Sequence, residues 1–81
     1  MNVNVMAIFR QKIGDIYHFD LLAVHQNLQS FTVGWLVFNS KTDNLTYSTT
    51  GFLNETSWDI TKLLEDVKKI IAMLERTFSD Q

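Results

Sequence analysis

Apolar residues recur at helical spacing along the last third of the chain, residues 57–78. The spacing of three and four positions places them on one face of a helix with 3.6 residues per turn, and charged residues fill the opposite face. Thr56 or Ser57 is expected to cap the first turn, with Asp59 as the capping-box partner of Thr56. The apolar stripe consists of Ile60, Leu63, Leu64, Val67, Ile70, Ile71, Leu74 and Phe78.

The residues before this helix read as strands separated by polar or glycine-containing turns. Residues 16–25 are ambiguous, because a helix there would align Tyr17, Leu21 and Val24 on one face, but their β-branched and aromatic content favours a strand. The length of 81 residues fits one domain, residues 1–81. We therefore predict an α+β fold: an antiparallel meander of about four strands packed against one C-terminal amphipathic helix, in the order ββββα, with βαββα as the alternative. The predicted strands are residues 3–10, 16–25, 31–39 and 45–50.

Both faces of the predicted sheet carry large apolar side chains. Strict alternation along residues 31–39 places Phe31, Val33, Trp35 and Val37 on one side and Leu36 with Phe38 on the other. Residues 1–54 carry only six of the chain's 16 charged residues, whereas a solvated sheet face is normally polar. One helix covers one face. The second face needs a second copy of the chain, a different protein or closure of the sheet into a barrel, and we expect a homodimer through the uncovered face or a strand edge.

The composition limits the cellular compartments and the classes of binding partner that we expect. The chain has no cysteine, which excludes disulfides and thiolate zinc sites. The N-terminus lacks the basic start of a signal peptide, and no segment approaches the ~20 apolar residues of a membrane span. We expect a cytoplasmic protein without membrane contact. The net charge of −2 comes without a basic cluster, which argues against nucleic-acid binding.

No motif predicts catalysis, a cofactor or a metal site. His18 and His25 point to opposite faces of a strand, and nothing in the sequence pairs the hydroxyls of residues 48–50 with a histidine. Asp15 and Asp20 would act as an acid and a base only across a cleft, which spacing alone does not show. The glycines are too scattered to cradle phosphate. We predict that the chain is not an enzyme, and an enzyme assembled at a dimer interface around His18 or His25 ranks third among the hypotheses.

The remaining signal is aromatic. Tryptophan and tyrosine are favoured as interface anchors, and we predict partner-binding roles for Phe31, Trp35, Tyr47 and Trp58. We predict the same role for Met73, which lies off the apolar stripe of the predicted helix. The predicted function is a non-catalytic protein-binding module, a small homodimeric inhibitor or adaptor of a larger protein. Small acidic inhibitors encoded by phages and other mobile elements share this size and charge, but no motif. The alternative is a single-stranded nucleic-acid-binding module with an aromatic sheet face.

Overall fold

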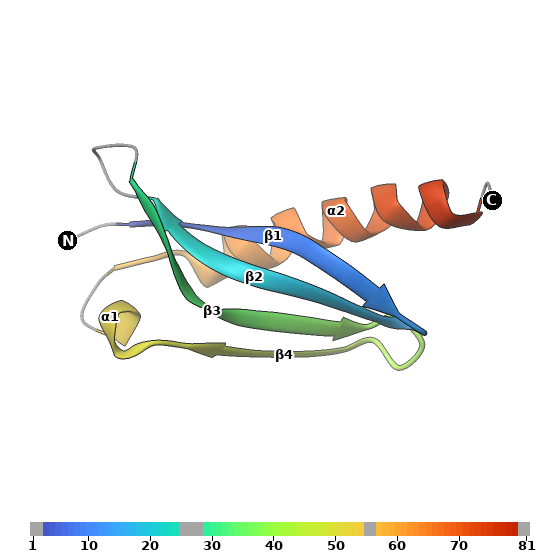
Figure 1. Cartoon of the computed structure of the whole chain (residues 1–81), viewed down its shortest axis with the longest axis horizontal. Coiled ribbons are helices and arrows are strands. Elements are labelled where there is room, and N and C mark those ends of the chain that lie inside the picture. The colour runs from blue at the N-terminus through green and yellow to red at the C-terminus, as the bar shows by residue number, and fades with distance from the viewer. Residues whose placement is uncertain (1–2, 25–28, 55–56, 80–81) are drawn as a thin grey trace.

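The computed structural model describes residues 3–24, 29–54 and 57–79. Four antiparallel strands form a meander in the order β1-β2-β3-β4, and a long C-terminal helix packs across one side of the sheet (Figure 1). This confirms the predicted ββββα fold and the strand assignment of the ambiguous second segment. The elements are β1 (Asn4–Ile13), β2 (Ile16–Val24), β3 (Ser30–Asn39), β4 (Asn44–Thr49), α1 (Gly51–Asn54) and α2 (Ile60–Ser79).

Two tight turns set the register of the meander. β1 runs three residues beyond its predicted end, so that only Gly14 and Asp15 form the turn before β2. Gly14 has φ = 59°, which matches the first central position of a two-residue hairpin and costs glycine nothing. Between β3 and β4, the Asn39 side-chain Oδ1 accepts hydrogen bonds from the backbone N–H of Lys41 (3.0 Å) and of Thr42 (3.3 Å). Both turns hold consecutive strands side by side.

The long helix begins later than predicted. Asp59 is its cap, because Asp59 Oδ1 accepts a hydrogen bond from the Lys62 N–H at 3.1 Å, and the Asp59 carbonyl accepts the first helical bond from Leu63 at 3.2 Å. Ser57, a predicted cap, instead accepts a hydrogen bond from the Val3 N–H through its carbonyl at 3.0 Å. Thr56, the other predicted cap, lies outside the described residues. The cap prediction was therefore wrong in its position.

The hydrophobic core lies between one face of the sheet and α2. Leu63, Val67 and Ile71 of α2 are buried, as the helical stripe predicts. The sheet contributes Ala7, Tyr17, Phe19, Leu21, Ala23, Val33 and Leu36. At the far end of α2, the Lys12 ammonium lies 5.4 Å from the Phe78 ring centre and 5.7 Å from that of Tyr17. Phe78 itself is 37% exposed, so the apolar stripe is less buried towards the C-terminus of α2.

A bulge in β3 corrects the predicted faces of that strand. The pairing between β2 and β3 shifts between Leu21 and Leu22, opposite Val33 and Gly34. Phe31 is therefore paired with the buried Ala23 and Leu36 with the buried Phe19, so both lie on the helix-side face. Gly34 permits the bulge because a Cβ at this position would overlap the backbone oxygen of Ser48. Strict alternation, which grouped Phe31 and Val33 with Trp35 and Val37, was wrong here.

Candidate functional site

The sheet face that points away from α2, here called the open face, is the main candidate site. Alternation from the buried residues of β2 places Leu22 and Asp20 on this side, and their register partners follow: Met6 opposite Leu22, and Trp35 opposite Asp20. α2 and α1 lie elsewhere, and no described element covers the open face (Figure 1). Its apolar members are Met6, Ile8, Ile13, Ile16, Leu22, Val24, Trp35 and Val37.

The open face is nearly free of charge. Its charged strand residues are Arg10 and Asp20, and they neutralise each other through an ion pair of 3.0 Å between Arg10 Nε and Asp20 Oδ2. Arg10 reaches Asp20 because it is the extra residue of a bulge between Phe9 and Gln11. Since both side chains are partly exposed, the pair contributes little to stability. Its effect is to leave an apolar surface without net charge.

The shape of the molecule shows how much surface stays uncovered. The radius of gyration is 13.3 Å, against about 11.7 Å for a compact domain of this length. The accessible surface is 5650 Å², against about 5000 Å² for a compact monomer of 9.4 kDa. A single sheet with one helix on one side produces this difference, because the other side of the sheet has no second layer.

His18 is the only histidine within the described residues, and it lies on the open face. It is half-buried, and Gln11 and Val37 flank it on the neighbouring strands. A shallow pocket of about 300 Å³ beside it is lined by Ile16, His18, Val37, Asn39, Asn44 and Thr46. This lining holds no carboxylate that would orient the imidazole as a base. His25 lies outside the described residues.

The buried side chains of the described residues include few groups that could take part in catalysis or metal binding. Among the described residues, no polar or charged side chain other than the Tyr17 phenol is buried, and no three His, Asp or Glu side chains gather as a metal site requires. Burial raises the pKa of Tyr17, and the nearby carboxylates of Glu75 and Asp15 raise it further. Tyr17 is therefore a neutral core residue at physiological pH. Neither described helix has the length and apolar composition needed to cross a membrane.

The five predicted partner-binding residues occupy four separate places. Trp35 lies on the open face and is 46% exposed. Phe31 lies on the helix-side face and packs edge-on against Phe52 of α1, with ring centres 5.0 Å apart. Tyr47 and Trp58 contact each other edge to face at 6.4 Å, also on the helix-side face. Met73 is exposed on α2, away from the core.

The separation of these five residues bears on whether they can form a base-stacking surface. Phe31 and the Tyr47–Trp58 pair lie at separate places on the helix-side face, Trp35 lies on the open face and Met73 lies on α2. The five residues therefore do not form one row on which bases could stack. Four of these predictions rested on aromatic residue type and that of Met73 on its place off the apolar stripe of the helix, so the apolar aliphatic residues of the open face were not among them. Their signal was present in the sequence, since alternation along β1 and β2 already places Met6, Ile8 and Leu22 apart from the core residues.

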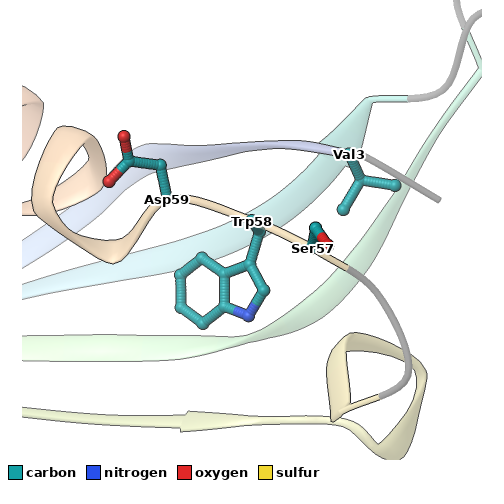
Figure 2. A pocket seen from close by; sticks show the side chains of 4 residues that line it. All are labelled: Val3, Ser57, Trp58 and Asp59. Atoms are coloured by element: carbon teal, nitrogen blue, oxygen red, sulfur yellow. The ribbon is translucent and has the colours of Figure 1, made fainter.

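The segment before α2 forms a second surface feature. Figure 2 shows the Trp58 ring extending from this segment over the sheet, beside an open pocket of about 290 Å³ lined by Val3, Ser57, Trp58 and Asp59. The ring packs against the core on one side and meets Tyr47 of β4 at its edge. Tyr47 and Trp58, here called the aromatic shelf, thus border the outer edge of the sheet.

Comparison of the chain with models of known protein families, with curated proteins and with solved structures finds no match.

Proposed function

We propose that this chain is a cytoplasmic, non-catalytic protein-binding module that acts as a homodimer and serves as a stoichiometric inhibitor or adaptor of a larger protein. The observation that carries the proposal is the open face, which presents large apolar side chains and one self-neutralised ion pair to solvent. Surfaces of this kind on small chains mark protein contacts.

The size of the open face suits a contact between two copies. β2 has nine residues, about 30 Å at ~3.3 Å per residue, and four strands at ~4.8 Å span about 19 Å. The projected area of roughly 570 Å² lies at the upper end of the patches that monomers expose. Protruding side chains enlarge the accessible area towards the ~800 Å² that each partner buries in a standard interface.

Charge also favours a second copy on this face. Each chain carries a net charge of −2, and ten of its 16 charged residues lie in residues 55–81. Two copies that meet through their open faces keep α2, which carries seven of these charged residues, on the outside, and each Arg10–Asp20 pair enters the contact as a neutral unit. Such a contact is self-complementary, which two-fold symmetry requires.

Light scattering coupled to size exclusion tests the dimer. We expect about twice the monomer mass of 9.4 kDa. Trp35→Lys puts a charge on the open face and should give the monomer mass. Met73→Lys changes a residue that is 57% exposed on α2 and should leave the dimer intact, which makes it the matched control. A wild-type chain that stays monomeric at high micromolar concentration would contradict the dimer.

A further inference from the structure

The outer edge of β4 has backbone groups without a partner among the described residues. The Thr50 N–H donates to the Val33 carbonyl at 2.7 Å, and the β3–β4 register continues without a shift from Gly34–Thr49 to Asn39–Asn44. Every second residue of an antiparallel strand directs its backbone N–H and C=O groups to the same neighbouring strand, and the residues between them direct theirs to the other side. Ser48 and Thr46 therefore bond to β3, whereas the N–H and C=O groups of Leu45, Tyr47 and Thr49 point outward.

The opposite edge of the sheet is protected, and β4 is not. Just before β1, the Val3 N–H donates a hydrogen bond to the Ser57 carbonyl. Within β1 a bulge at Arg10 interrupts the edge, and α2 packs alongside the strand. Arg10 and Lys12 add charge to the same strand. These are the features with which proteins prevent strand addition. β4 has the sequence NLTYST, with no charge, no proline and no bulge in its pairing.

The aromatic shelf supplies side-chain contacts beside this free edge. Tyr47 is 42% exposed and lies on the helix-side face of β4, where the Trp58 ring meets it. A strand added to β4 would turn every second side chain towards this face. Those side chains would lie next to Tyr47, within reach of cross-strand packing at ~5 Å.

We propose that the β4 edge binds an extended segment of the partner protein, which adds a fifth strand to the sheet. This inference rests on the proposed protein-binding function and identifies the form of the partner. The segment is neutral, because β4 offers no charge to pair with one. It carries apolar side chains at alternate positions, which pack on the aromatic shelf. Backbone hydrogen bonds to Leu45, Tyr47 and Thr49 supply affinity, and the shelf supplies specificity.

A phage-displayed library of random dodecapeptides, panned on the wild-type chain, provides the probe. Enriched peptides are synthesised with a fluorescent label, and their dissociation constants are measured for wild type, Tyr47→Val and Tyr47→Pro. Both variants lose the ring, but only proline removes the outward N–H while leaving the bonds to β3 in place. We expect alternating apolar peptides that bind Tyr47→Pro about five- to tenfold more weakly than Tyr47→Val, as the loss of one hydrogen bond predicts.

Amide hydrogen exchange locates the bound peptide. New protection should appear at the amides of Leu45, Tyr47 and Thr49. Absence of enriched peptides, equal affinity for the two variants, or protection elsewhere would each overturn the proposal. If circular dichroism shows that Tyr47→Pro does not fold, Thr49→Pro against Thr49→Val provides the same comparison at the end of the strand.

Light scattering on the same samples separates this inference from the proposed dimer. A dimeric chain without peptide binding contradicts strand addition alone. A monomeric chain that binds peptides through β4 contradicts the dimer alone. If Tyr47→Pro turns a dimer into a monomer and Tyr47→Val does not, the β4 edge holds a second copy of the chain, which also overturns the present proposal.

Discussion

Replacing Val67 by aspartate tests whether the apolar stripe of α2 holds the fold together. Val67 is fully buried and lies between Leu63 and Ile71 on the side of α2 that faces the sheet. The substitution removes about 1.5–3 kcal/mol of apolar burial. Keeping the introduced carboxyl protonated inside the fold at pH 7 costs about 4 kcal/mol, given an ordinary pKa of about 3.9 and 1.36 kcal/mol per pKa unit.

The sum of about 6 kcal/mol is comparable with the whole stability of the domain. At about 0.05–0.15 kcal/mol per residue, a chain of 81 residues has a net free energy of unfolding of about 4–12 kcal/mol. We therefore expect Val67→Asp to leave the chain largely unfolded at neutral pH, and to regain stability relative to wild type as the pH falls towards 4, because the folded state needs the neutral carboxyl.

Urea unfolding followed by circular dichroism at several pH values measures this effect. Ala72→Asp is the matched control, since Ala72 is exposed on the same helix and the change costs only about 0.7 kcal/mol of helix propensity. A cooperative urea transition of Val67→Asp at neutral pH with a midpoint close to that of wild type would refute the reasoning, because the stripe would then face something the fold does not need.

Three further substitutions test single contacts. Gly34→Ala should lower the free energy of unfolding by about 1–3 kcal/mol, because the added Cβ meets the Ser48 backbone; Gly51→Ala, where nothing lies within 4 Å, is its control in urea unfolding. Asp59→Ala should cost about 1 kcal/mol through loss of the helix cap, and Asp59→Asn should retain most of it. The raised pKa of Tyr17 means that its contribution to stability is complete below pH 10 and is lost as the pH rises through the folded-state pKa. Tyr17→Phe should therefore lose less stability than wild type as the pH rises above about 10, and equal slopes for the two would contradict this.

The fold followed from the sequence because both of its periodicities are strong. The stripe from Ile60 to Leu74 has helical spacing over four turns. In the strands, strand-forming residues run between polar or glycine-containing turns, and these turns fix where each strand begins and ends. The errors are local. Residues 51–54 form α1, a single turn too short to produce a periodic signal. The sequence placed the helix cap at Thr56 or Ser57 instead of Asp59 because Thr56, Ser57 and Asp59 lie within four positions and each is a residue type that caps helices.

The bulge in β3 explains why the faces were harder to predict than the strands. One extra residue, Val33 beside Gly34, inverts the alternation of the β3 residues before it, and strict counting cannot detect this. A glycine inside a strand indicates a bulge, and Gly34 was the only indication of this bulge in the sequence of β3. The prediction of the site residues was incomplete for the same reason. Aromatic residue type favoured four of the five predicted positions, whereas the open face is defined by which residues stand opposite one another in the sheet.

The two proposed surfaces are compatible because they occupy different parts of the same sheet. Face-to-face packing of two sheets buries side chains that project from the open face, whereas strand addition uses backbone groups at the rim. The outward groups of Leu45, Tyr47 and Thr49 lie in the plane of the sheet, and the aromatic shelf lies on the helix-side face, opposite the proposed dimer contact. A two-fold dimer therefore keeps two β4 edges accessible, one on each copy. A partner with two extended segments would bind such a dimer more tightly than a single segment binds one edge, with no contact beyond those already described.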